Sequence, residues 1–155
     1  RHVAAFLCDF AQKLPKVTLT HISLVGAHLN GEAYPMRNAM VTVLGQLLMR
    51  GFETQRDNGN TNQLQTQLRT KQAMLDTLVD RAHDVTSYVR SRVLQTWTQL
   101  CEEDAIPLPH LLVVTELAVG RLKDKASVVR KSAMQLLFTL VTMNPFGAAL
   151  PSAQL

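Results

Sequence analysis

The sequence is poor in the residues that build disulfide-rich, fibrous or disordered proteins. Its 155 residues include two cysteines, seven glycines and six prolines, and aromatic residues make up 5%. Two cysteines, Cys8 and Cys101, are too few for a disulfide-rich secreted scaffold, and we expect both to be reduced core residues of an intracellular protein. The glycine and proline content excludes collagen-like and proline-rich chains. With 46% hydrophobic and 18% charged residues, the chain is also too apolar to be disordered throughout.

Long uninterrupted apolar runs are missing too. Residues 132–155 carry no charge, but only Ala133 to Met143 is densely apolar, and prolines and a glycine interrupt residues 144–151. A helix that crosses a bilayer needs about 20 mostly apolar residues. We therefore interpret this part as a buried helix followed by a loop, and expect no membrane contact. Because the chain begins at Arg1 without a leader-like segment, we expect it to be a piece of a longer protein.

Motifs of nucleotide-binding and hydrolytic enzymes are absent. The sequence has no glycine-rich phosphate loop, no GxSxG, no HExxH and no CxxC. Its five histidines show no metal-ligand spacing, and the acidic residues 102–104 lie together at one predicted helix end, whereas catalytic carboxylates usually come from separate elements. We therefore expect no catalytic residue, metal site, cofactor or small-molecule substrate, and predict that the protein is not an enzyme.

What the sequence has in abundance is helical periodicity. Apolar residues recur every three or four positions along almost the whole chain, and no segment shows the sustained alternation of a strand. Pro15 is expected to end the first helix, and Pro35 to lie in the first turn of a later one. We predict an all-α fold, with a helix over about 18–29 and further helices around apolar stripes at residues 3–14, 36–48, 74–82, 89–101, 111–122 and 128–141.

Residues 53–70 differ in kind from the rest. They are rich in glutamine and asparagine and contain only two leucines, Leu64 and Leu68. Such a segment buries too little apolar surface to offset the entropy cost of ordering it. We predict an inserted, mobile polar loop.

An internal repeat indicates how the helices are arranged. The segment from Asp84 to Arg90 aligns with that from Asp124 to Arg130 at an offset of forty residues, and Asp, Ser, Val and Arg coincide. Arg37 takes the place of the arginine in an earlier copy, at an offset longer by about the length of the polar loop. A period of about 40–47 residues is typical of HEAT and armadillo repeats, which are helical hairpins. We predict a HEAT-type α-solenoid of about three helical hairpins plus a leading helix.

This repeat divides the chain into five parts. Residues 1–52 hold the leading helix and the first repeat, 53–70 the polar loop, 71–104 the second repeat, 105–145 the third, and 146–155 a tail. Neither end has the polar face of a capping repeat. We therefore expect further repeats to flank this segment in the longer protein, and an isolated chain to be sticky or to pair with another copy.

The repeated Asp and Arg have a mechanical interpretation. The aspartate and the following threonine or serine lie at the turn into the second helix of a hairpin, where a side-chain acceptor satisfies a free N–H group. The arginine follows one turn later, and it can reach an aspartate of its own repeat or of a neighbour. We assign to these residues a structural role, as a ladder along the stack, with ligand contact by the arginines as the alternative. The ladder consists of Arg37, Asp84, Arg90, Asp124 and Arg130.

The net charge of +4 is unevenly distributed. Residues 121–131 hold five basic residues against one acidic residue. Such a cluster either attracts a polyanion or forms a solvated turn, and composition does not distinguish the two. If the chain binds DNA, we expect contacts to phosphates without base readout. The candidates for these contacts are Arg92, Arg121, Lys123, Lys125 and Lys131.

Several segments resemble the condensin complex subunit 1 family, the non-SMC HEAT-repeat subunits also called D2. They are residues 31–39 (GEAYPMRNA), 83–95 (HDVTSYVRSRVLQ), 117–125 (LAVGRLKDK) and 144–146 (NPF). The 83–95 block is the most specific, since other HEAT repeats share only its Asp and its Val-Arg pair. The resemblance spans about residues 27–146. Asn30 and Pro35 depart from the family pattern, and the polar loop has no counterpart in it.

The resemblance implies a non-catalytic regulatory subunit of condensin. Such subunits bind the kleisin chain, contact an SMC ATPase head and double-stranded DNA, and help to condense chromosomes in mitosis. It also implies location in the nucleus and on chromosomes, with a cytoplasmic pool in interphase. Two other interpretations remain open: a protein-only HEAT adaptor that holds a peptide between helices without binding nucleic acid, and a solenoid of the transport-receptor or phosphatase-scaffold type.

Overall fold

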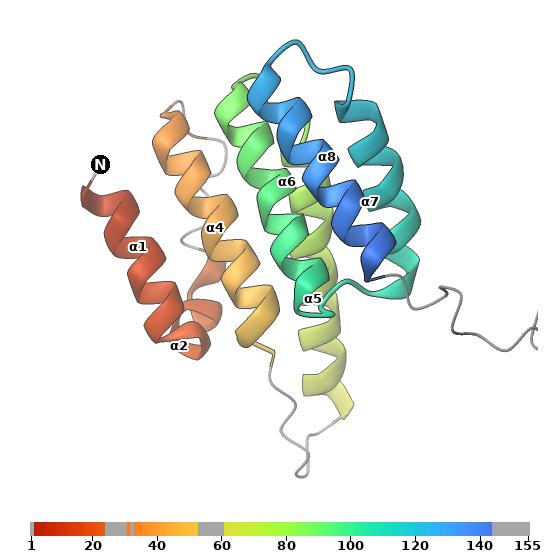
Figure 1. Cartoon of the computed structure of the whole chain (residues 1–155). Helices are drawn as coiled ribbons and strands as arrows, with labels where there is room; N and C mark the ends of the chain where they lie inside the picture. Colours follow the sequence, from red (N-terminus) through yellow and green to blue (C-terminus); the bar gives the residue numbers. More distant parts are fainter. Residues whose placement is uncertain (1, 24–30, 32, 53–60, 144–155) are drawn as a thin grey trace, which may run out of the picture.

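The computed structural model describes residues 2–23, 31, 33–52 and 61–143 (Figure 1). These residues form seven helices and no strand, so the predicted all-α fold is confirmed. The helices are α1 (His2–Lys13), α2 (Pro15–Thr20), α4 (Tyr34–Arg50), α5 (Thr61–Arg81), α6 (Ser87–Glu102), α7 (Leu108–Arg121) and α8 (Ser127–Thr142). No helix in the described part of the chain is long and apolar enough to cross a membrane.

Four helices stand side by side in one layer. α1 packs on α4, α4 on α6 and α6 on α8, from red to blue in Figure 1. The other helices form a second layer: α5 lies behind α4 and α6 in Figure 1 and contacts both, α2 contacts α1 and α4, and α7 lies beside α8 and contacts it. Because each described helix contacts mainly the helix next to it along the chain or the one after that, the arrangement is the successive stacking of hairpins that defines a solenoid.

The core lies between the two layers. Trp97 is its largest fully buried side chain, and Leu75 and Leu78 of α5 meet the front row from behind. The face of α4 toward α6 is especially close: a Cβ atom added at Gly45 would lie 2.4 Å from Cγ2 of Thr96. This glycine is therefore required by close packing of two helices.

Two prolines lie at helix starts. Pro15 was expected to end the first helix, and Pro35 to lie in the first turn of a later one. α1 ends at Lys13, two residues before Pro15, and Pro15 itself starts α2, where its missing N–H group is not needed. Pro35 likewise lies in the first turn of α4. The helix predicted over 18–29 overlaps α2 only at residues 18–20, because α2 starts at Pro15 and a turn at His21 ends it. Residues 24–30 lie outside the described residues.

The predicted polar loop is wrong for residues 61–70, which form the first half of α5. Leu64 and Leu68 are 54% and 59% exposed there, so apolar burial is not what holds these turns. The later part of α5 is anchored in the core by Met74, Leu75 and Leu78. Extending an existing helix costs far less than nucleating one, and glutamine is a good helix former. Residues 53–60 and the tail lie outside the described residues, and the remaining repeat boundaries stay predictions.

The acidic residues 102–104 end α6. Asp104 has a φ of 51°, its N–H group donates to the Cys101 carbonyl at 3.1 Å, and the N–H group of Ala105 donates to the Leu100 carbonyl at 2.8 Å. This is the Schellman pattern of hydrogen bonds, which satisfies the last carbonyl groups of a helix.

Candidate interaction surface and arginine–aspartate ladder

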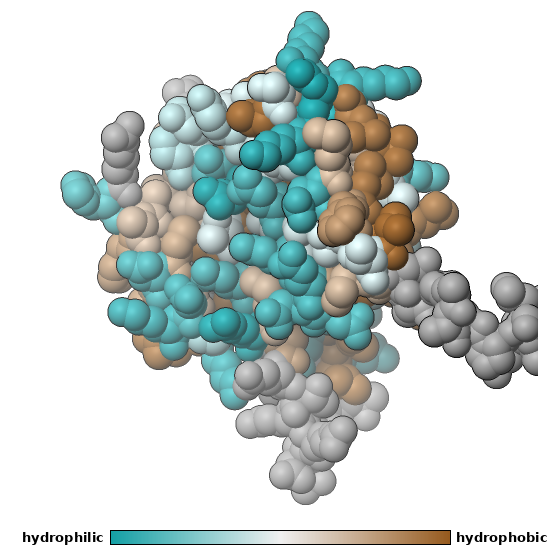
Figure 2. Space-filling model, in the orientation of Figure 1, coloured by the Kyte–Doolittle hydropathy of each residue, from teal (hydrophilic) through white to brown (hydrophobic). Residues whose placement is uncertain are grey.

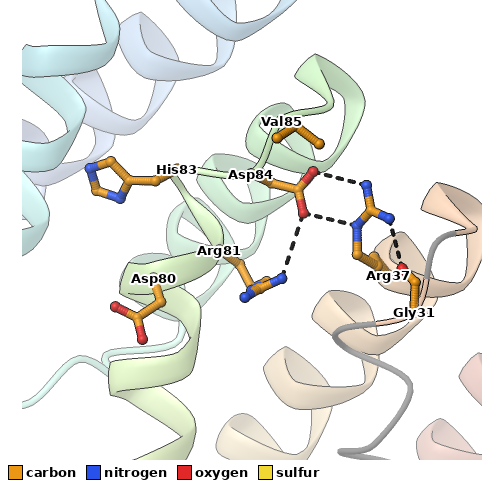
Figure 3. A pocket seen from close by; sticks show the side chains of 7 residues that line it. All are labelled: Gly31, Arg37, Asp80, Arg81, His83, Asp84 and Val85. Atoms are coloured by element: carbon orange, nitrogen blue, oxygen red, sulfur yellow. Dashed lines mark hydrogen bonds and ion pairs between the residues drawn. The ribbon is translucent and has the colours of Figure 1, made fainter.

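The first rung of the ladder joins α4 to the turn before α6. Nε of Arg37 donates to Oδ2 of Asp84 at 2.9 Å, and Nη2 donates to Oδ1 at 3.1 Å. The remaining nitrogen, Nη1, donates to the Gly31 carbonyl at 2.8 Å (Figure 3). Nη2 also donates to Oγ1 of Thr86 at 3.1 Å. The Arg37 and Asp84 side chains are only 9% and 3% exposed. The rung is therefore a buried, bidentate ion pair whose other groups are also hydrogen-bonded.

The second rung repeats this geometry between α6 and the turn before α8. Nε and Nη2 of Arg90 donate to Oδ2 and Oδ1 of Asp124, both at 2.8 Å. Nη1 donates to the Asp84 carbonyl at 2.8 Å and the Val85 carbonyl at 3.1 Å. The hydrogen bond from Arg90 holds the pKa of Asp124 well below its usual range, and the same bond raises the pKa of Arg90. Each arginine thus binds the aspartate of the following repeat, rather than the one in its own repeat.

Each aspartate also shapes its own turn. Oδ1 of Asp84 accepts the N–H group of Thr86 at 2.8 Å, and Oδ1 of Asp124 accepts that of Ala126 at 3.0 Å. In both turns this residue immediately precedes the helix, and its backbone is extended. The aspartate therefore positions the start of the second helix while it binds the arginine of the preceding repeat.

A second arginine stands beside each aspartate, three residues before it. Nη1 of Arg81 lies 3.8 Å from Oδ2 of Asp84, and Nη1 of Arg121 lies 3.3 Å from Oδ2 of Asp124. The sequence analysis treated Arg121 only as a DNA candidate and missed this contact. The recurrence of Arg three positions before each Asp, at the same forty-residue offset, was the available signal.

Arg130 has the same position in the third repeat, with one difference. Its Nη1 donates to the Asp124 carbonyl at 2.9 Å and the Lys125 carbonyl at 3.0 Å, as Nη1 of Arg90 does one repeat earlier. No residue in the described part of the chain accepts a hydrogen bond from its Nε or Nη2. The third arginine is therefore oriented like the other two but has no carboxylate partner among the described residues.

The five candidate DNA contacts do not share one environment. Lys123 and Lys125 are exposed in the turn between α7 and α8, whereas Arg121 is half-buried against the ladder. Arg92 and Lys131 are exposed on the neighbouring helices α6 and α8. Hydrophilic side chains project from the molecule at the end where the α7–α8 turn lies (Figures 1 and 2).

A shallow groove of about 600 Å³ runs between α6 and α8. Its floor is a hydrogen bond of 2.9 Å between the hydroxyl groups of Ser91 and Ser132. Three exposed glutamines stand along the groove, together with Tyr88 and Lys131. These glutamines are Gln95, Gln99 and Gln135. The groove is therefore rich in amide donors and acceptors.

His110 makes structural contacts, and both cysteines are free thiols. Nε2 of the buried His110 lies 3.0 Å from Nε2 of Gln72 and 3.7 Å from Oδ1 of Asp76, which ties α7 to α5. Both cysteines are free thiols whose pKa is raised, first of all by burial. Cys101 is buried as predicted, but Cys8 is only partly buried. Among the described residues, no group of three or more His, Cys, Asp or Glu side chains is placed to hold a metal ion.

Comparison with known proteins relates the chain to one family. No protein-family model matches it. It is 44% identical over 149 residues to the condensin-1 complex subunit CAP-D2 of Arabidopsis thaliana and 39% identical over 153 residues to condensin complex subunit 1 of Homo sapiens. These alignments cover 96% and 98% of the chain but 10% of each relative. The subunit of Saccharomyces cerevisiae is 25% identical over 146 residues. The resemblance seen in the sequence is thus confirmed, and the chain is homologous to one segment, about a tenth of the full length, of the condensin complex subunit 1 proteins.

Proposed function

We propose that the chain is part of a non-catalytic regulatory subunit of condensin and acts as a scaffold that binds the kleisin subunit and DNA. The observation that carries this proposal is the 37–44% identity, over nearly the whole chain, to plant and vertebrate proteins named as condensin subunits. A scaffold of this kind works in chromosome condensation during mitosis. It resides in the nucleus and on chromosomes, with a cytoplasmic pool in interphase, and also contacts an SMC ATPase head.

The groove between α6 and α8 supports the binding of an extended segment of kleisin. An extended peptide has unpaired backbone N–H and C=O groups, and glutamine amides offer both a donor and an acceptor to them. Gln95 and Gln135 face the groove from opposite helices, and Lys131 adds a positive charge for an acidic side chain. The proposed peptide thus lies along the line where two repeats meet.

The turn between α7 and α8 supports contact with DNA phosphates. Arg90 and Arg121 both bind the carboxylate of Asp124, which is the one acidic side chain in this stretch. Lys123 and Lys125 are exposed beside this paired carboxylate. Exposed lysines bind phosphates through charge, without base readout, and release counterions as they do so. DNA binding is therefore expected to weaken steeply as salt increases.

A gel shift with double-stranded DNA over a salt series tests the DNA contact. The variant with Lys123, Lys125 and Lys131 changed to Glu should lose DNA retention while keeping its helical circular dichroism. A matched control changes Lys13, Lys16 and Lys71 to Glu, which removes the same charge from other parts of the chain. If the first variant binds as wild type does, the proposed contact is wrong. If both variants lose binding equally, net charge alone explains retention and the local contact is also wrong.

A pull-down with segments of kleisin and with the SMC head tests the protein contacts. We expect capture of a kleisin segment that is lost when Gln95, Gln135 and Lys131 are changed to Ala, with Lys71→Ala as the control. Capture of kleisin by a chain that fails to bind DNA at low salt favours the protein-only HEAT adaptor instead. Failure to bind either partner contradicts the scaffold proposal and favours an adaptor of the transport or phosphatase-scaffold type.

A further inference from the structure

A shallow hollow of about 400 Å³ lies where α1, α2 and α4 meet. It is lined by the last residues of α1, the first residues of α2, and Arg50 at the end of α4. In Figure 1 the ends of α1 and α4 point away from the end of the molecule where the turn between α7 and α8 lies. The hollow shares no lining residue with the groove between α6 and α8, so it is a separate feature of the surface.

Three exposed basic side chains line this hollow. They are Lys13, Lys16 and Arg50. Unlike the first two arginines of the ladder, none of them forms an ion pair with a carboxylate in the described part of the chain. The sequences of α2 and α4 contain no acidic residue, and that of α1 contains one, Asp9, which does not line the hollow. The hollow is therefore a local excess of positive charge that attracts an anionic group.

Helix dipoles account for two of these cations but not for the third. Lys13 and Arg50 lie in the last turns of α1 and α4, where a positive charge stabilises a helix. Lys16 is the second residue of α2, where the dipole disfavours a positive charge. The position of Lys16 thus adds nothing to helix stability, whereas a shared anionic ligand gives all three side chains one role.

Two exposed apolar side chains lie beside the cations. Leu14 is 47% exposed and Val17 is 46% exposed, and both line the hollow together with Pro15. A ligand that brings only anionic groups leaves these side chains in water, while a ligand with an apolar side chain covers them. The hollow therefore fits a ligand that combines negative charge with an apolar group. An acidic polypeptide has this combination, and the phosphate backbone of DNA lacks it.

We propose that this hollow binds a short acidic segment of a separate polypeptide. The carboxylates of the segment contact Lys13, Lys16 and Arg50, and one of its apolar side chains packs against Leu14 and Val17. The charges attract the segment, and the apolar contact distinguishes it from other polyanions. The proposal does not depend on the kleisin and DNA contacts proposed above, since those contacts involve other residues.

Fluorescence anisotropy with the 155-residue chain and labelled synthetic peptides tests the proposal. The leucine peptide consists of glutamates with a leucine at every third position. In the serine peptide the leucines are replaced by serine, and in the glutamine peptide the glutamates are replaced by glutamine. We expect the leucine peptide to bind and the other two to bind at least about tenfold more weakly, because one loses the apolar contact and the other the ion pairs.

A variant in which Lys13, Lys16 and Arg50 are changed to Ala should bind the leucine peptide at least about tenfold more weakly than wild type. A matched control removes the same charge elsewhere and should bind within about twofold of wild type, because salt screens distant charges. The residues changed to Ala in this control are Lys123, Lys125 and Lys131. Val17→Ser should weaken binding of the leucine peptide about threefold and leave binding of the serine peptide unchanged. Circular dichroism verifies that each variant is folded.

Four results would overturn the proposal. The first is no binding of the leucine peptide by wild type. The second is an equal loss in the two triple variants, which would show that net charge alone attracts the peptide. The third is equal binding of the leucine and serine peptides, which would remove the apolar contact. The fourth is a gel shift in which double-stranded DNA is released by changing Lys13, Lys16 and Arg50 but not by the control, which would assign the hollow to nucleic acid.

Discussion

The two complete rungs of the ladder have the same geometry but different surroundings. In the first rung, Nη2 of Arg37 donates to the Thr86 hydroxyl at 3.1 Å as well as to Asp84. In the second, Ala126 takes the place of that threonine and offers no hydroxyl group. The supporting arginine is closer in the second rung, at 3.3 Å against 3.8 Å, and Arg90 is more exposed than Arg37, at 14% against 9%.

This difference shows how one sequence motif can be held by a different balance of contacts in each repeat. The Arg37 guanidinium is more deeply buried than that of Arg90, so losing the carboxylate bound to it should cost more stability. In the second rung the supporting arginine lies closer to the carboxylate, and the hydrogen bonds from Arg90 and Arg121 lower the pKa of Asp124. Removal of the aspartate should therefore lower the free energy of unfolding more in the first rung than in the second. Acid should weaken the second rung.

The largest effect is expected from Asp84→Ala. This substitution leaves the Arg37 guanidinium buried without the carboxylate of Asp84 and removes the acceptor for the Thr86 N–H group, so it should lower the free energy of unfolding by about 3–5 kcal/mol. Asp124→Ala should cost less, because Arg90 is nearer to solvent. Urea unfolding followed by circular dichroism measures both values, with the exposed Asp80→Ala as a control expected to be within about 0.5 kcal/mol of wild type. An Asp124→Ala cost equal to or above that of Asp84→Ala would contradict the comparison.

Acid should weaken the second rung. The pKa of Asp124 is lowered by folding, so its contribution to stability is fully present above the ordinary carboxyl pKa of about 4 and is lost as pH falls through the lowered value. The contribution is on the order of 2 kcal/mol. Urea unfolding of wild type and Asp124→Asn at pH 7, 5, 4 and 3 should give curves that converge below pH 4. Curves that stay parallel over this range would show that Asp124 titrates alike in the folded and unfolded chain.

The close packing beneath the first rung gives the next effect. Gly45→Ala places a methyl group 2.4 Å from Cγ2 of Thr96 and should destabilise the fold by about 1–2 kcal/mol, as overpacking does. Thr96→Ser removes Cγ2 and should recover part of this loss. Gly120→Ala is the matched control in α7: nothing lies within 4 Å of its added Cβ, so it should raise stability by about 0.5 kcal/mol. Thermal melts of Gly45→Ala, of Gly45→Ala with Thr96→Ser, and of Gly120→Ala test these expectations, and a neutral Gly45→Ala would contradict them.

Exchanging the residue that differs between the rungs should have the smallest effect. Thr86→Ala removes one hydrogen bond to Arg37 and makes the first rung like the second, at a cost of about 1 kcal/mol. A double-mutant cycle with Arg37→Gln measures whether the loss of stability comes from the interaction between Thr86 and Arg37. Additive losses in that cycle would show that the hydroxyl contributes nothing to the rung.

Much of this architecture follows from periodicity that is local in the sequence. The stripes that predict α6 and α8 lie within those helices, and the stripe over 111–122 passes the end of α7 by one residue. Pro15 and Pro35 lie at helix starts, as local stereochemistry favours. The first half of α5 escaped prediction, because its turns are held by the helix that continues from them and not by their own apolar residues. The ion pair between Arg121 and Asp124 was not predicted, because a cluster of basic residues indicates local charge but not where each side chain points.

The helical character of the chain, the recurrence of its hairpins and the equivalent places of Asp and Arg in them could be predicted from the residues alone, because these properties depend on spacings of a few residues or on a fixed offset. The packing of the helices was needed to show that each arginine binds the aspartate of the following repeat and that Gly45 is required where α4 meets α6. Those properties depend on the distance between helices, which is set by side chains that meet across the stack and are far apart along the chain.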